Sequence, residues 1–303
     1  MNFSDIINSI LVLTVIMFIG FVISKLRIIT NEGASIISNF IMKVTFPITI
    51  IISMQKEFSK ELFKTSLILI GLSAVIYFVL IIAVLGWGKI SKFNKNKTKI
   101  IQFLIIFGNV AFMGFPVASA IYGDMGIFYA SCFNMLYNIL MFTVGIIILN
   151  SDGGKFEVSK LLNPGAVASV IGFIFFITSF KLPYVIYRPL QWIGDMTIPL
   201  ALLIVGYNLT KIKFRSLINE PLLWIYSIER LIVFPLIVLV ILKAIGLNEH
   251  LLVIPVVLIA TPAPLTAGVF AKTYGGDEEI ANKGIVLTNF LAILTIPLII
   301  YFM

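Results

Sequence analysis

Two stretches of this sequence could do chemistry with uncharged groups, because each sets a polar side chain among helix-breaking residues. The first, at 108–116, reads Gly-Asn-Val-Ala-Phe-Met-Gly-Phe-Pro, and the second, at 261–268, reads Thr-Pro-Ala-Pro-Leu-Thr-Ala-Gly. Glycine and proline both disfavour a regular helix. A broken helix exposes carbonyl oxygens where its first half ends and amides where its second half begins. The carbonyl ends suit a cation, and the amide ends suit a carboxylate.

The candidate substrate-binding residues lie at these breaks or in neighbouring apolar segments. Asn109 and Thr261 would add hydrogen-bonding groups to the breaks. Asn134 and Asn138 are four residues apart and therefore share one face of a helix, which we expect to lie beside the first break. The alternative for all candidates is structural, as simple kinks, close packing of small residues or interhelical hydrogen bonds. The complete set is Gly108, Asn109, Gly114, Pro116, Asn134, Asn138, Thr261, Pro262, Pro264, Thr266 and Asn289.

Two residues of opposite charge, Lys43 and Asp195, also lie inside apolar segments, where a lone charge is costly. Three interpretations stay open: an ion pair, extension of each side chain to the membrane interface, or a role in coupling or substrate binding. Glu229 and Arg230 interrupt another apolar segment and allow similar interpretations. The segments around the breaks carry acids only at their ends. Proton coupling would therefore need Asp195, Glu229 or a carboxyl group of the substrate.

The elements that must position these residues are membrane spans. Hydrophobic residues make up 60% of the chain and charged residues 12%, with a mean hydropathy of +1.09, whereas a soluble domain has about 25% charged residues. The connections are short and polar, so we predict an all-α polytopic membrane protein of ten transmembrane helices. The expected spans are 6–24, 35–54, 62–87, 100–121, 124–149, 162–180, 185–209, 222–245, 250–273 and 280–302.

The basic residues predict an orientation rather than a nucleic-acid partner. The net charge is +8, but Lys and Arg lie between the spans and form no contiguous face. If each connection takes the number of the span that it follows, odd-numbered connections hold fourteen Lys and Arg residues and even-numbered connections hold six. The positive-inside bias then predicts cytoplasmic odd connections and both termini outside the cell membrane.

The sequence also repeats itself at an offset of 152 residues. Lys-Val-Thr-Phe-Pro ends at Pro47 and Asp-Met-Thr-Ile-Pro ends at Pro199, and the same offset lays the first broken stretch on the second. We predict two repeats of five helices, 1–150 and 161–303. Because five is odd, the second copy enters the membrane from the opposite face. Inverted repeats of this kind are typical of secondary transporters.

Three stretches carry a family resemblance: GNVAFMGFP at 108–116, TIPLALLIVG at 197–206 and PAPLTAGVFAKTYGGDEEIA at 262–281. They resemble the auxin efflux carrier family, in its bacterial malate and malonate permease branch. The resemblance implies a fold similar to that of bile-acid sodium symporters, in which spans four and nine cross. It further implies a transport domain of spans 3–5 and 8–10, a scaffold of spans 1, 2, 6 and 7, and a homodimer formed through spans 2 and 7.

Together these features predict a secondary transporter that moves a small organic anion by elevator-type alternating access. The alternatives are a sodium-coupled symporter, with sodium at the carbonyl ends of the broken helices, and a membrane sensor of the same fold that does not transport. We expect no enzyme, cofactor or metal site, because no acid pair, ligand cluster or nucleophile–base arrangement stands out. Sodium or proton coupling stays open. The expected partners are the organic anion, membrane lipid and a second copy of the chain.

Overall fold

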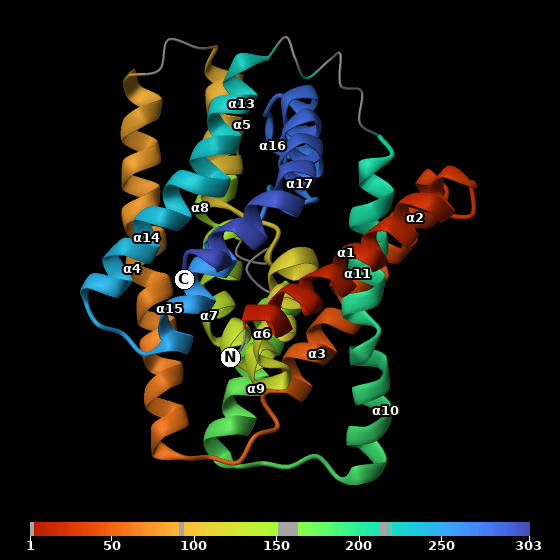
Figure 1. Cartoon of the computed structure of the whole chain (residues 1–303), viewed down its shortest axis with the longest axis vertical. Helices are drawn as coiled ribbons and strands as arrows, with labels where there is room; N and C mark the ends of the chain where they lie inside the picture. The colour runs from red at the N-terminus through yellow and green to blue at the C-terminus, as the bar shows by residue number, and fades with distance from the viewer. Residues whose placement is uncertain (1–2, 91–93, 151–162, 212–216, 218–219) are drawn as a thin grey trace. The chain divides into compact units, whose positions relative to one another are not determined.

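The computed structural model describes residues 3–90, 94–150, 163–211, 217 and 220–303. All regular elements among them are helices (Figure 1). In chain order these are α1 (Phe3–Lys25), α2 (Asn31–Phe40), η1 (Ile41–Thr45), α3 (Phe46–Ser53), α4 (Lys60–Ile90), α5 (Lys95–Ile106), η2 (Val110–Gly114), α6 (Phe115–Tyr122), α7 (Asp124–Phe142), α8 (Val144–Leu149), α9 (Pro164–Thr178), α10 (Tyr184–Asp195), α11 (Thr197–Leu209), α13 (Pro221–Ile228), η4 (Glu229–Val233), α14 (Phe234–Ala244), α15 (Glu249–Ile259), α16 (Ala267–Tyr274) and α17 (Glu278–Tyr301). The three η elements are single π-helical turns.

Eight helical segments among the described residues are long and apolar enough to cross a membrane. Two further apolar helices, α9 and α15, are shorter. The all-helical polytopic fold class is confirmed, although helix length alone does not establish the count of ten. The eight segments are Asn8–Lys25, Asn31–Ser53, Lys60–Lys89, Lys95–Tyr122, Asp124–Leu149, Tyr184–Leu209, Pro221–Ala244 and Glu278–Tyr301.

Five of the basic residues behind the predicted orientation lie outside the described residues. They are Lys92, Lys155, Lys160, Lys213 and Arg215. The location of both termini outside the cell therefore stays a prediction.

Both expected helix breaks are present. In span four, the helix ends with α5, and the chain has no regular structure at residues 107–109. The helix resumes with η2 and continues into α6. The helix of span nine stops with α15, has no regular structure at residues 261–264, and resumes as α16. The first break lies earlier than Gly114 and Pro116 suggested. Gly114 closes η2, and Pro116 is the second residue of α6, which continues directly from that π turn.

The α-helices that end the two broken spans, α6 and α16, match in length and in how they end. The first residues of α6 and α16 are 152 positions apart, and so are their last residues. Each helix is followed by a glycine with positive φ, at 58° for Gly123 and 94° for Gly275, a conformation that glycine adopts without strain. This correspondence supports the predicted repeat, whose boundaries stay a prediction.

The chain packs as two compact units, each of which we describe by itself. Unit 1 comprises 1–71, 111–135 and 162–211, and unit 2 comprises 72–110, 136–161 and 212–303. The boundaries between the units fall inside α4 and α7. The division therefore reflects the density of contacts and does not coincide with the predicted five-helix repeats. The grouping of spans into a scaffold and a transport domain stays a prediction.

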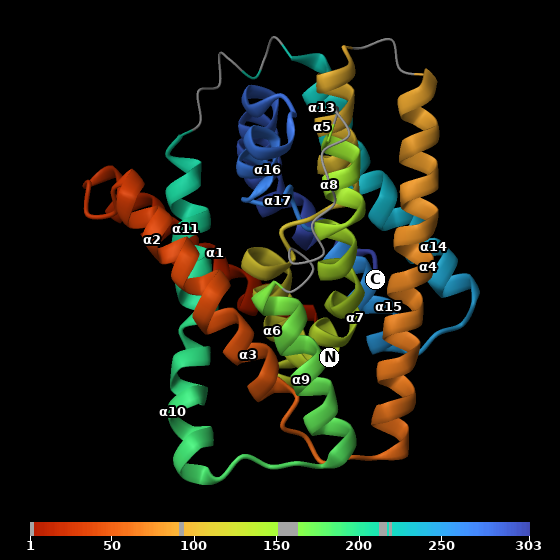
Figure 2. The ribbon, with the colours of Figure 1, turned by 180° about the vertical axis from the view of Figure 1, so that it is seen from behind.

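In unit 1, α1 packs closely against α11 (Figures 1 and 2). A Cβ atom at Gly20 would overlap the backbone of Leu203, and a Cβ atom at Gly206 would overlap the backbone of Met17. Small residues allow this approach, as is common between helices in membranes. On another side of unit 1, α3 packs against α9 and α10.

In unit 1, Thr49, two residues beyond the first copy of the repeated motif that ends at Pro47, contacts the second copy at Thr197. Thr45 and Thr197 are both fully buried. The hydroxyl of Thr49 lies 2.8 Å from that of Thr197, 3.0 Å from the carbonyl of Thr45 and 2.8 Å from the carbonyl of Gly194. Thr49 therefore joins α3 to the junction of α10 and α11 by uncharged hydrogen bonds.

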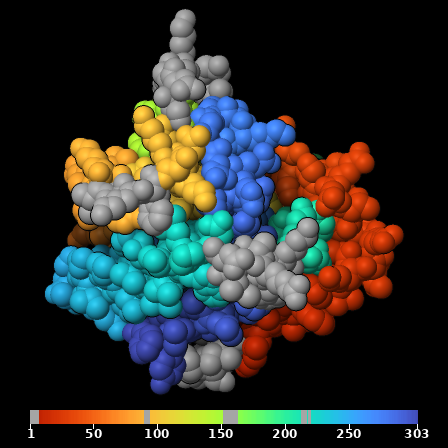
Figure 3. All heavy atoms as spheres, turned by 90° about the horizontal axis from the view of Figure 1, so that it is seen from above, coloured from red at the N-terminus to blue at the C-terminus, as the bar shows by residue number. Residues whose placement is uncertain are grey.

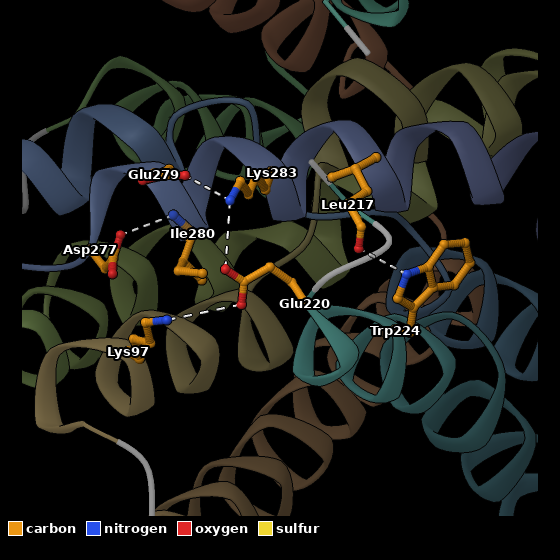
Figure 4. Close-up of polar contacts among 8 residues, drawn as sticks. All are labelled: Lys97, Leu217, Glu220, Trp224, Asp277, Glu279, Ile280 and Lys283. Carbon is orange, nitrogen blue, oxygen red and sulfur yellow. Dashed lines mark hydrogen bonds and ion pairs between the residues drawn. The ribbon is translucent and has the colours of Figure 1, made fainter. Parts of the chain in front are cut away.

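In unit 2, α17 packs against both α5 and α13, and charged residues connect one end of these three helices. Figure 3 shows the gold, teal and blue atoms of this end adjoining on the surface. Glu220, just before α13, lies 3.9 Å from Lys97 and 3.6 Å from Lys283, which also pairs with Glu279 at 2.7 Å (Figure 4). Asp277 caps α17 by accepting a hydrogen bond from its third amide. This charged end is typical of a membrane–water boundary.

The close packing of α1 and α11 can be tested with Gly206→Ala. We expect overpacking to destabilise the protein by about 1–3 kcal/mol, because the backbone of Met17 cannot move aside as a flexible side chain could. Gly71→Ala is the matched control, since no atom lies within 4 Å of its added Cβ. Thermal unfolding in detergent compares the variants, and equal midpoints would contradict the close approach.

Candidate functional site

The two broken helices touch at their breaks, within unit 2. The backbone N–H of Asn109 donates a hydrogen bond to the carbonyl of Pro262 at 2.7 Å. The N–H of Ala263 donates to the hydroxyl of Thr288 at 3.0 Å, and that hydroxyl donates to the carbonyl of Gly284 at 2.7 Å. Backbone groups freed by the breaks thus find partners inside the protein, as the low polarity of a membrane requires.

The carbonyl ends of both broken helices converge on one guanidinium group. Nη1 of Arg230 donates to the carbonyls of Ile105 at 2.7 Å and Ile106 at 3.3 Å, which end α5. Nε donates at 3.0 Å to the carbonyl of Thr261, just beyond α15, and Nη2 lies 3.4 Å from the hydroxyl of the same residue. Arg230 is fully buried, and no carboxylate among the described residues forms an ion pair with it.

The sequence places Arg230 here through a local distortion of its helix. Arg230 lies in η4, which is followed by Phe234-Pro235 at the start of α14. Proline cannot donate to the preceding turn, and its ring crowds the carbonyl four residues earlier, so the helix widens there into a π turn. The two other π turns among the described residues, η1 and η2, are likewise followed by Phe-Pro, at 46–47 and 115–116.

Gly108 provides the space that Arg230 needs. A Cβ atom at this position would overlap Nη2 of Arg230 and the hydroxyl oxygen of Thr261. The carbonyl of Gly108 accepts a hydrogen bond from the phenol of Tyr137 on α7. The sequence identified Gly108 as a helix breaker, and the structure adds close approach to a buried cation as a reason for glycine.

Several polar atoms of unit 2 are buried without a hydrogen-bond partner in the protein. They belong to the candidate set: Nδ2 of Asn109, Nδ2 of Asn138, Oδ1 of Asn289 and Oγ1 of Thr266. Asn289 uses its other amide atom on the carbonyl of Ile285 at 2.7 Å. Buried polar groups are normally satisfied, so these donors and acceptors are available to a ligand or water.

Three candidates belong to unit 1 and are described apart from this crossing. Gly114 and Pro116 lie in η2 and α6, beyond the first break. Asn134 is almost fully buried, with both amide atoms unpartnered. Because the boundary between the units falls between Asn134 and Asn138, their predicted common face toward the break stays a prediction.

Lys43 and Asp195 are both exposed and form no ion pair with each other in this conformation. Asp195 lines a small pocket of about 50 Å³ in unit 1, together with Lys56, Asp124 and Gln191. The proposed roles of Lys43 and Asp195 in coupling or substrate binding stay predictions.

Sequence reasoning noted Arg230 but did not connect it with the breaks, and it missed Tyr137. One signal was available: of the 22 basic residues, only Lys43 and Arg230 lie deep inside a predicted span, whereas the other twenty lie in the connections or within four residues of a span end. Arg230 also precedes a Phe-Pro pair, as do the residues of the first break. The long-range contacts themselves, from Arg230 to Ile105 and Thr261, could not be read from spacing.

The comparisons with known proteins agree on the class of protein. The chain matches the family described as "Membrane transport protein" over residues 5–161 and 153–300. The chain therefore belongs to this auxin efflux carrier-like family of membrane transporters, and the predicted resemblance is confirmed.

Curated relatives match over nearly their full length. An uncharacterized transporter of Methanocaldococcus jannaschii is 24% identical, covering 95% of this chain and 96% of its own. An uncharacterized transporter of Methanothermobacter thermautotrophicus is 23% identical, with 96% of each chain covered. A Rhizobium meliloti protein provisionally named a malonate transporter is 22% identical, covering 94% of this chain and 92% of its own.

The close approach at Gly108 can be tested by Gly108→Ala. We expect the added methyl group to displace Arg230 and Thr261 and to destabilise the protein by about 1–3 kcal/mol. The control is Gly86→Ala in α4 of unit 2, where no atom lies within 4 Å of the added Cβ. Tryptophan fluorescence during thermal unfolding provides the measurement. A midpoint for Gly108→Ala equal to that of Gly86→Ala would contradict this role.

Proposed function

We propose that this membrane transporter is a secondary transporter for a small organic anion that carries a carboxylate. The observation that carries the proposal is the hydrogen bond between the two breaks, from Asn109 to Pro262, with unpartnered buried amides beside it. Discontinuous helices at the interface of inverted repeats are the usual binding architecture of secondary transporters.

The chemistry of the crossing favours an anion over a cation as substrate. The carbonyl ends are already engaged by Arg230. At the start of α16, the amides of Ala267 and Phe270 donate to the carbonyls of Pro264 and Thr266, which leaves those of Gly268 and Val269 without an acceptor in their own helix. The partial positive charge at this helix end stabilises an anion. Thr266 immediately precedes α16, and its hydroxyl is unpartnered, so it offers a donor to a carboxylate at the same place.

The relative provisionally named for malonate supports a dicarboxylate as the first substrate to test. Malonate is small and has two carboxylates. One carboxylate could accept hydrogen bonds from the amides of α16, and the other from the side chain of Asn109. An elevator-type movement of the segments around the crossing is our proposed mechanism.

The proposed orientation has both termini outside the cell, following the charge bias of the connections. The proposed oligomer is a homodimer formed through spans 2 and 7, as the family resemblance implies. Among the described residues, the outward surface of α10 in span 7 carries large exposed apolar side chains, including Val185 and Trp192. These are compatible with either lipid or a second copy.

Uptake of radiolabelled malonate into proteoliposomes tests the function. We expect saturable uptake by the wild type and a loss on the order of tenfold or more for Asn109→Ala, because a hydrogen bond to a charged group contributes about 1.5–3 kcal/mol. Asn208→Ala is the control, since that amide donates to the carbonyl of Ile204 within its own helix.

Pro264→Ala, which favours a continuous helix, should also reduce uptake. If both crossing variants transport malonate as the wild type does, the binding site is misplaced. If a panel of other small carboxylates and malonate all fail with the wild type, the proposed function is wrong.

A further inference from the structure

The carbonyl ends of the two broken helices form an electrostatic site for a cation. A helix C-terminus carries a partial charge of roughly −0.5. Two such ends, from α5 and α15, therefore present about one unit of negative charge to the same point. In transporters with broken helices, ends of this kind coordinate a coupling cation such as sodium.

Arg230 already fills this site. All three guanidinium nitrogens contact acceptors, which are the carbonyls of Ile105, Ile106 and Thr261 and the hydroxyl of Thr261. The side chain is fully buried and has no carboxylate partner among the described residues. Its single positive charge balances the roughly one unit of negative charge that the two helix ends supply.

We propose that Arg230 is a built-in cation, whose guanidinium replaces a coupling ion at the carbonyl ends and makes ligand binding at the crossing independent of sodium. The inference rests on the proposed transport function for the identity of the site. It argues against the sodium-coupled alternative, because that alternative needs the same carbonyl oxygens.

The guanidinium shape suits this task better than an ammonium group. Its donors form a rigid planar fork that contacts acceptors in different directions, whereas lysine carries one compact charge. Here the fork joins the end of α5, through Ile105, to the end of α15, through Thr261. Gly108 leaves the space for Nη2. Because the guanidinium donors are bound to backbone carbonyls, Arg230 holds the ends of α5 and α15 together. Binding of the substrate is then the task of other groups at the crossing.

The first experiment measures thermal unfolding of the wild type in detergent, in chlorides of sodium, lithium, potassium and choline at equal ionic strength. We expect the same midpoint in all four salts. A midpoint that rises with sodium concentration relative to choline would overturn the inference, because it would reveal a cation site that is open in the presence of Arg230.

The second experiment removes the charge. Arg230→Ala should lower the midpoint by about 10 °C, because the carbonyl ends lose their partner. Millimolar methylguanidinium should restore part of this loss by entering the space left by the side chain. Arg230→Met keeps the stem and its packing but not the charge, so it should be destabilised and should not respond to methylguanidinium.

Arg188→Ala is the control, since Arg188 is an exposed arginine that donates to Gln191 at 2.8 Å, and neither the substitution nor methylguanidinium should shift its midpoint greatly. An Arg230→Met variant as stable as the wild type, or an Arg230→Ala variant that methylguanidinium does not restore, would contradict the inference. If the Arg230 variants do not fold, the salt series on the wild type decides alone.

These stability measurements do not depend on the substrate. Failure to transport malonate or other carboxylates would overturn the proposed function while leaving the salt series and the methylguanidinium response interpretable. Conversely, sodium-dependent malonate uptake would support transport and overturn the built-in cation.

Discussion

The structure depends on one constraint: a helix that breaks inside a membrane must find new partners for its backbone groups. At the crossing these partners come from within unit 2. The amide of Asn109 in one break donates to the carbonyl of Pro262 in the other. The hydroxyl of Thr288 accepts a hydrogen bond from the amide of Ala263, and Arg230 donates hydrogen bonds to carbonyls at both helix ends. The same groups that stabilise the breaks therefore decide which charges remain available to a ligand.

Proline has two different effects in this chain. Pro262 and Pro264 lie in the irregular stretch of span nine, where each lacks the backbone N–H that a continuous helix would need. Pro116 and Pro235 instead lie at the second position of a regular helix, and each is preceded by a π turn. The wide turn before Pro235 accommodates Arg230, whose side chain reaches both helix ends. A proline in this chain can therefore change the direction in which a nearby side chain points, by widening one helical turn, as well as break a helix.

Much of the fold followed from local pattern. Apolar length identified the spans, and paired glycine and proline identified both breaks, because these effects act within one segment. The offset of 152 residues anticipated that α6 and α16 would begin and end at corresponding positions. Three findings depended on three-dimensional contact: the location of the first break at Phe107–Asn109, the engagement of Arg230 and the threonine contact between Thr49 and Thr197. Spacing contains no information on which side chain reaches a carbonyl 125 residues away.

The short length of α16 has a consequence for depth. This helix has eight residues and therefore extends about 12 Å at 1.5 Å per residue, whereas the second half of span four is longer because η2 runs directly into α6. The hydrocarbon core of a bilayer is about 30 Å thick. A half-helix of the length of α16 that starts at a membrane surface ends before the midplane. A ligand at the second break would then be separated from water on that side by only about two helical turns of protein.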